Sequence, residues 1–248
     1  MKILLLLLLL LPISLPSETH FSWEEWIKDT FLNEDFMKGL DEDVVINDGT
    51  GLIDIQAPYR ALNGANVPIT ISTKSRDILK YILIVDENPT PCCAIFEFDN
   101  MPAYVETNIR VNAYTYLRVL AEDRFGDVYM VTKFIKAAGG CSAPGLIDSG
   151  NPKGTITVKS PYSYPGVTNY QFWHPNYSGM QFDQLTRTEI PAEYIEKVDI
   201  EFDNSSFRYE GTIGIAENVY FNLITEKGVG TITATDSDGN IFSKQLED

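Results

Sequence analysis

Residues 197–202 read Lys197-Val198-Asp199-Ile200-Glu201-Phe202, so charged and apolar side chains alternate one by one. Because successive side chains of a strand point to opposite faces of a sheet, this stretch predicts a strand with one buried face. The same period of two recurs in residues 219–223 and in residues 108–119, where we expect the polar members, among them Arg110, on the exposed face. Residues 81–85 are continuously apolar, which predicts a strand buried on both faces.

Turn signals separate these strand-like stretches. Phe125-Gly126-Asp127 predicts a hairpin turn between two strands. Asp236-Ser237-Asp238-Gly239-Asn240 leads into the last strand-like stretch. A Gly-containing hairpin is favoured there over a calcium loop, because the Glu that closes a twelve-residue calcium loop is missing. Many short strands joined by such turns predict an all-β protein with two immunoglobulin-like β-sandwich domains.

One short helix is expected near the N-terminus, over residues 22–38. Ser22 with Glu25 three positions later forms a capping-box pattern, and apolar residues at Trp23, Trp26 and Phe31 recur at helical spacing. These aromatic side chains predict a helix that packs onto the body of the protein.

The first 17 residues are interpreted as a signal peptide. Lys2 supplies a positive charge, an almost pure leucine run reaches Leu11, and Ser17 is the last residue that we expect to be removed. The run is shorter than the roughly 20 apolar residues of a membrane-spanning helix. The sequence therefore predicts an exported protein that is not held in the membrane after cleavage.

The composition excludes two classes of partner. The chain has 19 Lys and Arg against 35 Asp and Glu, a net charge of −16. A surface this acidic repels the phosphates of nucleic acids and anionic lipids, so neither is expected to bind.

The strongest change of composition in the mature chain lies at residues 139–152, which are rich in Gly, Ser and Pro. Such a segment is typical of a domain boundary. We expect a first domain over residues 18–138, a linker over residues 139–152 and a second domain over residues 153–248.

The three cysteines call for different interpretations. Cys92 and Cys93 precede an apolar stretch, so at least one of them is expected to point into the core in a structural role. A bridge between these neighbours would strain the backbone. Cys141 lies between glycines and other small residues that we expect to leave its thiol uncovered, and apart from Lys136 no basic residue lies close to it in the sequence. It is therefore a candidate reactive thiol that a partner activates, with an inert cysteine or a bridge to Cys92 or Cys93 as alternatives.

No metal site is predicted. His20 and His174 are the only histidines, and no Cys-x-x-Cys pair is present. His174 stands between Trp173 and Pro175 and is interpreted as a packed residue rather than as a ligand or a group that poises a thiol.

The first half of the chain resembles SoxY, one subunit of the periplasmic thiosulfate-oxidation carrier. The resemblance rests on three segments: Ala57-Pro58-Tyr59-Arg60-Ala61-Leu62-Asn63-Gly64-Ala65-Asn66-Val67-Pro68-Ile69, Asn88-Pro89-Thr90-Pro91 before Ala94-Ile95-Phe96, and Gly139-Gly140-Cys141.

The second half resembles SoxZ, the other subunit. Here the segments are His174-Pro175 with Ser178-Gly179-Met180, Ile190-Pro191-Ala192-Glu193-Tyr194-Ile195, and Asp236-Ser237-Asp238-Gly239. Their order predicts a single-chain SoxY–SoxZ fusion, similar to carriers associated with quinoprotein dehydrogenases.

The resemblance implies a function for Cys141. Its thiol would hold sulfur-containing intermediates covalently while Gly139 and Gly140 act as a swing arm, with no cofactor and no active site in the carrier itself. The family's arm is a free C-terminus, whereas Ser142-Ala143-Pro144 continue this chain, so we expect a loop tethered at both ends.

The resemblance also implies partners and a location. The expected partners are periplasmic sulfur-oxidation enzymes, namely a c-type cytochrome and a hydrolase, and the expected location is the periplasm. Two alternatives are a non-catalytic accessory protein of a periplasmic quinoprotein dehydrogenase, and a redox enzyme that pairs Cys141 with Cys92 or Cys93.

Overall fold

The computed structural model describes residues 45–144, 150–160, 166–183, 185–225 and 228–247. Every regular element in these ranges is a β-strand. The first half contains β1 (Ile46–Asp48), β2 (Ile53–Gln56), β3 (Val67–Thr73), β4 (Ile78–Val85), β5 (Cys92–Asp99), β6 (Tyr104–Ile109), β7 (Thr115–Asp123) and β8 (Val128–Ile135). The second half contains β9 (Ile156–Lys159), β10 (Val167–Phe172), β11 (Phe182–Asp183), β12 (Thr188–Glu189), β13 (Ile195–Phe202), β14 (Ser206–Gly211), β15 (Tyr220–Ile224), β16 (Gly230–Asp236) and β17 (Ile241–Leu246).

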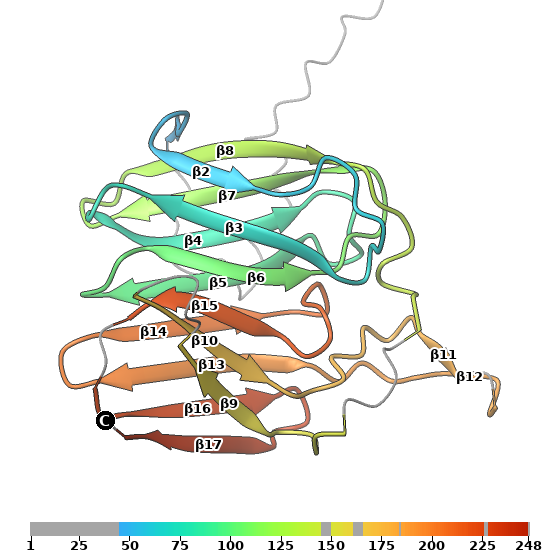
Figure 1. Ribbon diagram of the computed structural model, residues 1–248. Coiled ribbons are helices and arrows are strands. Elements are labelled where there is room, and N and C mark those ends of the chain that lie inside the picture. The colour runs from blue at the N-terminus through green and yellow to red at the C-terminus, as the bar shows by residue number, and fades with distance from the viewer. Residues whose placement is uncertain (1–44, 145–149, 161–165, 184, 226–227, 248) are drawn as a thin grey trace, which may run out of the picture. The chain divides into compact units, whose positions relative to one another are not determined.

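Two large sheets face each other across one core (Figure 1), and β11 and β12 form a separate two-stranded sheet. Nine strands make one sheet in the order β1-β8-β7-β4-β5-β14-β13-β16-β17, and six make the other in the order β2-β3-β6-β15-β10-β9. The prediction of an all-β, immunoglobulin-like sandwich is confirmed.

Both sheets continue from the first half of the chain into the second. In the larger sheet β5 pairs antiparallel with β14, from Ser206 opposite Asp99 to Gly211 opposite Ala94. In the smaller sheet β6 pairs with β15. The two halves therefore join edge to edge, and residues 43–248 form one compact unit. The domain limits at residues 138 and 153 stay predictions.

The sequence patterns explain most strands directly. Residues 81–85 of β4 are buried throughout, as a continuous apolar run predicts, and β13 buries Val198 and Ile200 on its inner face. Phe125-Gly126-Asp127 forms the predicted hairpin between β7 and β8, with Gly126 in the left-handed region at φ 86°. Residues 237–240 form the predicted hairpin between β16 and β17.

The prediction of one strand over residues 108–119 is wrong. Residues 108–119 alternate in polarity, yet β6 ends at Ile109 and β7 begins at Thr115, so the stretch contains a connection between the two sheets. Arg110 and Asn108, which the pattern placed on the exposed face, are 1% and 4% exposed. The alternation fails here because the chain leaves one sheet and enters the other.

Two predictions fall outside the described residues: the signal peptide over residues 1–17 and the helix over residues 22–38. No helix in the described part of the chain is long and apolar enough to cross a membrane.

Candidate functional site

The cysteine segment, residues 139–144, lies along the connection between β6 and β7. The Gly139 amide donates to the Asn112 carbonyl at 2.7 Å, and the Gly140 amide donates to the Val111 carbonyl at 3.1 Å. These backbone bonds hold the segment in a docked position against the body of the protein.

The two glycines of this segment have different structural roles in the docked position. Gly139 adopts φ 68°, in the left-handed region that glycine enters without strain. A side chain at Gly140 would overlap the Gly64 carbonyl, so the absence of a Cβ permits the close approach of two backbones. The swing-arm role of Gly139 and Gly140 stays a prediction.

Cys141 is 0% exposed. The expectation that small neighbours leave its thiol uncovered is wrong, because distant parts of the chain pack against the segment. Among them is Ser178, whose hydroxyl donates to the Cys141 carbonyl. Burial raises the pKa of the Cys141 thiol to about 11, and the nearby charge of Arg110 offsets part of this rise. Docked Cys141 is therefore a protonated thiol at neutral pH rather than a nucleophilic thiolate.

Arg110 is the residue whose positive charge lowers the pKa of the Cys141 thiol, and it is almost completely buried. Its Nη1 donates to the Gly140 carbonyl and its Nη2 to the Asn176 carbonyl, both at 3.1 Å. Its Nε has no hydrogen-bond partner in the structure. Burial lowers the pKa of Arg110, and the acidic groups of Cys141 and Glu217 partly restore it. One guanidinium thus bridges the cysteine segment and the second half of the chain.

Asn88 holds the connection that carries Arg110. Its Nδ2 donates to the Arg110 carbonyl at 2.8 Å, and its Oδ1 accepts from the Asn112 amide at 2.9 Å. The Arg110 amide donates to the Gly214 carbonyl at 2.7 Å. Residues of both halves therefore fix the backbone on which Cys141 docks.

Cys92 and Cys93 begin β5 and are buried, as expected for core residues. Burial raises the pKa of the Cys93 thiol well above its usual value, and the proximity of Cys92 and Cys141 raises it further. Within the described residues, no disulfide bond joins Cys92, Cys93 and Cys141.

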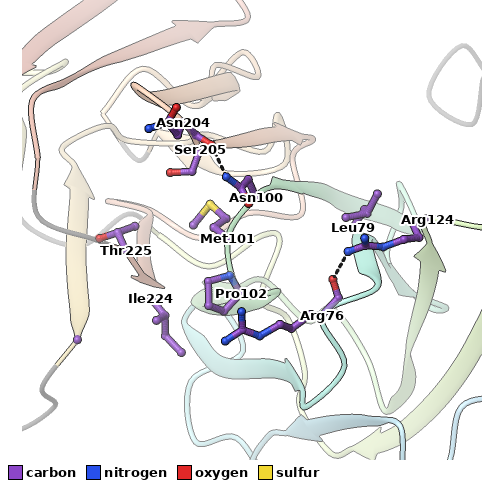
Figure 2. A pocket seen from close by; sticks show the side chains of 11 residues that line it. Arg76, Leu79, Asn100, Met101, Pro102, Arg124, Asn204, Ser205, Ile224 and Thr225 are labelled. Atoms are coloured by element: carbon purple, nitrogen blue, oxygen red, sulfur yellow. Dashed lines mark hydrogen bonds between the residues drawn. The ribbon is translucent and has the colours of Figure 1, made fainter.

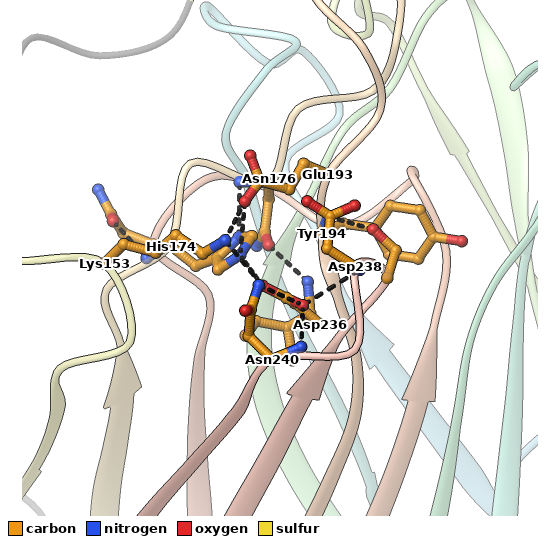
Figure 3. A network of polar contacts seen from close by, with 11 residues as sticks. Lys153, His174, Asn176, Glu193, Tyr194, Asp236, Asp238 and Asn240 are labelled. Carbon is orange, nitrogen blue, oxygen red and sulfur yellow. Dashed lines mark hydrogen bonds and ion pairs between the residues drawn. The ribbon is translucent and has the colours of Figure 1, made fainter.

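A second polar cluster joins the loops of the second half (Figure 3). Lys153 pairs with Glu193 and, at 2.8 Å, with Asp236. The buried His174 lies 3.4 Å from Asp236 through its Nε2. Burial opposes ionisation of Asp236, but hydrogen bonds from Lys153 and Asn240 outweigh it and hold its pKa well below the usual range. Burial lowers the pKa of His174, so the ring is neutral at pH 7.

The same cluster has the donor atoms of a metal site. One donor atom each from His174, Glu193 and Asp236 lies within 4.8 Å of the others. The Lys153 ammonium pairs with both carboxylates and so supplies the positive charge that a metal ion would bring. The arrangement is that of a structural ion-pair network, in agreement with a packed His174.

Asn176 connects this network to the cysteine segment. Its amide donates to His174 Nδ1 at 3.1 Å, its carbonyl accepts from Arg110, and its Oδ1 accepts from the Ile195 amide at 2.9 Å. A continuous chain of polar contacts therefore runs from Lys153 to Gly140.

The segments that carry the family resemblance converge here. Gly64 contacts Gly140, Asn88 holds the backbone of Arg110, and Ser178 contacts Cys141. Residues 174, 193 and 236 come from the three SoxZ-like segments and meet in the polar cluster. Segments scattered over the sequence thus meet either at the backbone of the cysteine segment or in the polar cluster that Asn176 connects to it.

A cavity of about 540 Å³ lies elsewhere, at the opposite ends of β5 and β6 (Figure 2). Its lining includes Arg76, Asn100, Met101 and Ser205. Asn100 donates to the Asn204 carbonyl at 2.7 Å, which joins the two halves at this end. None of the predicted site residues lines this cavity.

Sequence reasoning missed two residues of the thiol site. Arg110 was placed on an exposed strand face, and Ser178 was named only as part of a motif. No local sequence pattern predicts that Arg110 is buried. Its burial arises because it lies on the connection between the two sheets and contacts Gly140 and Asn176, which are distant in the sequence.

The chain combines a SoxY-like part and a SoxZ-like part. Residues 40–141 match the family model of sulfur oxidation protein SoxY, and residues 167–247 match that of sulphur oxidation protein SoxZ. The prediction of a SoxY-like part followed by a SoxZ-like part in one chain is confirmed. Association with quinoprotein dehydrogenases stays a prediction.

Solved structures give weaker likenesses. The sulfur carrier protein SoxY from Chlorobium limicola f thiosulfatophilum is 25% identical, with 47% of this chain and 100% of that chain covered and a TM-score of 0.38. A beta-glycosidase from Bacteroides vulgatus is 9% identical, with 79% and 24% covered and a TM-score of 0.23. The mixed-linkage glucan utilization locus protein SGBP-B of Bacteroides ovatus is 12% identical, with 83% and 46% covered and a TM-score of 0.22. No curated protein matches the chain.

Proposed function

We propose that this chain is a carrier of sulfur oxidation that holds sulfur-containing intermediates covalently on the Cys141 thiol and presents them to oxidising enzymes. The observation that carries the proposal is the position of Cys141. It is the last residue of the SoxY match, it is buried, and residues from both family matches contact its segment: Gly64 contacts Gly140, and Ser178 donates to the Cys141 carbonyl. The catalytic groups belong to the partner enzymes in this proposal, and the carrier has no active site of its own.

The chemistry of a thiol suits this role. Joining the Cys141 sulfur to a sulfhydryl sulfur of the cargo forms an S–S bond and removes two electrons and two protons. An electron-accepting partner, for which we propose a c-type cytochrome, takes the electrons. Exchange with a second thiol then breaks this S–S bond: the sulfur of the second thiol joins the cargo sulfur, and the Cys141 sulfur leaves as a thiolate that takes up the proton which the second thiol gives up.

The docked position has a consequence for this cycle. A thiol with 0% exposure cannot enter the active site of a partner. The cysteine segment must therefore leave its position against residues 111 and 112 before it reacts. Freedom of the backbone at Gly139 and Gly140 allows this movement, within the limits of a loop that is tethered at both ends.

We place the carrier in the periplasm, on the ground of the predicted signal peptide over residues 1–17. Its net charge of −16 favours docking onto basic surfaces of partner enzymes.

Intact-mass measurement tests the proposal directly. Protein isolated from its native cells during growth on reduced sulfur compounds is expected to carry sulfur-containing adducts, and peptide mapping is expected to place them on Cys141. Cys141→Ser is expected to lose both the adducts and the growth phenotype, whereas the matched control Cys92→Ser keeps them. A bare Cys141 thiol under every sulfur-feeding condition would rule the carrier role out.

A second candidate function is a non-catalytic accessory protein of a quinoprotein dehydrogenase, with Cys141 as an incidental residue. The complete burial of the thiol favours it. It predicts that the Cys141→Ser variant keeps the full biological phenotype, which is the opposite of the result expected for a carrier.

A further inference from the structure

The contacts of Arg110 are unusual for a buried cation. Glu217 is near enough for its charge to raise the pKa of Arg110, but in the described ranges of the chain no carboxylate forms an ion pair with Arg110, whose two Nη groups donate only to the backbone carbonyls of Gly140 and Asn176. Among the described residues its Nε has no hydrogen-bond partner. A buried guanidinium normally has a carboxylate partner, because the loss of its hydration is costly.

We infer that Arg110 is the positioning residue that latches the cysteine segment in its docked position and so controls access to the Cys141 thiol. The inference rests on the proposed function for its biological purpose, since access matters only if the thiol reacts. The latch acts on the backbone: Arg110 contacts the carbonyl of Gly140, one residue before Cys141, and Asn176 in the second half.

Ser178 is the second contact of the latch. Its hydroxyl donates to the Cys141 carbonyl, and its own amide donates to Gln181 Oε1 at 2.8 Å. Arg110 and Ser178 therefore hold two consecutive carbonyls, of Gly140 and Cys141, from the first and second halves of the chain. Neither contact involves the thiol, so the latch acts on the backbone of the cysteine segment.

The same contacts explain how the latch can open. Undocking breaks the bond between Arg110 and Gly140, but it also lets water reach a guanidinium whose Nε lacks an acceptor. Hydration of the charge offsets much of the lost bond. The docked and undocked positions are therefore closer in free energy than the complete burial of Cys141 alone suggests.

Site-resolved thiol labelling tests the latch in the full chain. The purified protein is treated with iodoacetamide, a neutral probe, and the rate at each cysteine is read by peptide mass spectrometry. Arg110→Gln is expected to speed labelling of Cys141 by roughly 10- to 100-fold, the range for loss of one charged hydrogen bond, with unchanged rates at Cys92 and Cys93. Arg110→Lys keeps the charge with fewer donors, so a smaller increase is expected.

Controls separate a latch from a general loss of stability. Arg118→Gln removes a partly buried Arg that pairs with Asp86 at 2.7 Å, and it is expected to leave the rate at Cys141 unchanged. Ser178→Ala is expected to speed labelling of Cys141 alone. An unchanged rate at Cys141 in both Arg110 variants overturns the latch, and so does a parallel increase at all three cysteines.

The outcome is independent of the carrier role. Labelling needs no natural cargo, so a protein that never carries sulfur in cells can still show the latch. Conversely, adducts on Cys141 together with unchanged labelling of the Arg110 variants would support the carrier and remove the latch.

Discussion

At the scale of single residues, burial and charge act on Cys141 in opposite directions. Removal from water favours the neutral thiol, while the guanidinium of Arg110 favours the thiolate. Burial has the larger effect, since the pKa of the thiol is raised to about 11. A thiol of this kind is unreactive while docked, so its nucleophilicity depends on where the segment lies rather than on a basic neighbour in the sequence.

This pKa predicts a loss of stability in alkaline solution. The thiol of an unfolded chain ionises near pH 8.5, whereas docked Cys141 stays protonated up to about pH 11. The stability contributed by the protonated thiol is therefore complete below pH 8.5 and is lost as the pH rises towards 11. Between pH 7 and pH 10, the free energy of unfolding of the native chain, measured in urea, is expected to fall by about 1–2 kcal/mol relative to that of Cys141→Ala. A difference between the two proteins that stays constant over this range would contradict the buried, protonated thiol.

At the scale of elements, a polar network ties together the loops next to four strands of the second half. Lys153 precedes β9, His174 follows β10, Glu193 precedes β13, and Asp236 ends β16. The Asp236 carboxylate also accepts from the amides of Asp238 and Asn240, which shapes the hairpin to β17. Through Asn176 the same network supports the contact between Arg110 and the second half.

Asp236→Asn is expected to destabilise the protein by about 2 kcal/mol at pH 7, because it removes a buried carboxylate that pairs with the partly exposed Lys153 and accepts hydrogen bonds from Asn240. The folded-state pKa of Asp236 lies below its unfolded value, so its stabilisation is present above about pH 4 and is lost as the pH falls. We therefore expect denaturant unfolding to show that the native chain and Asp236→Asn differ less in their free energy of unfolding in acid than at pH 7. Asp199→Asn, which breaks the more exposed pair with Arg208, is the control and is expected to cost less than about 1 kcal/mol. Equal effects of the two substitutions would contradict the network.

At the scale of the whole molecule, the two halves share their sheets and their core. Phe96 from β5 contacts Phe207 and Tyr209 from β14 and Phe221 from β15, with ring centroids 5.8–6.3 Å apart. All four rings are fully buried. Because the cluster belongs to both halves, neither half can bury its aromatic residues alone.

Phe221→Ala is expected to lower the free energy of unfolding by about 4 kcal/mol, through a cavity in this shared cluster. Since the strands of both halves depend on the cluster, differential scanning calorimetry is expected to show one transition for residues 43–248, shifted as a whole to lower temperature. Two separate transitions, with only one shifted by the substitution, would contradict a shared core. Phe242→Ala, at the half-buried edge strand β17, is the matched control with a smaller expected shift.

The alternation of residues 197–202 and the apolar run at residues 81–85 were sufficient to predict these two strands and their buried faces, because side chains alternate between the two faces of a strand. The same alternation was not sufficient at residues 108–119, where the chain passes from one sheet to the other. The order of short motifs likewise determined the SoxY-like and SoxZ-like halves. Only the tertiary structure decided that both sheets continue across the halves, that Arg110 is buried, and that Cys141 is docked. These features arise from contacts between residues far apart in the sequence, such as Arg110 with Asn176 and Cys141 with Ser178. Small neighbours along the chain say nothing about such cover, since burial is decided by what packs against a side chain in space.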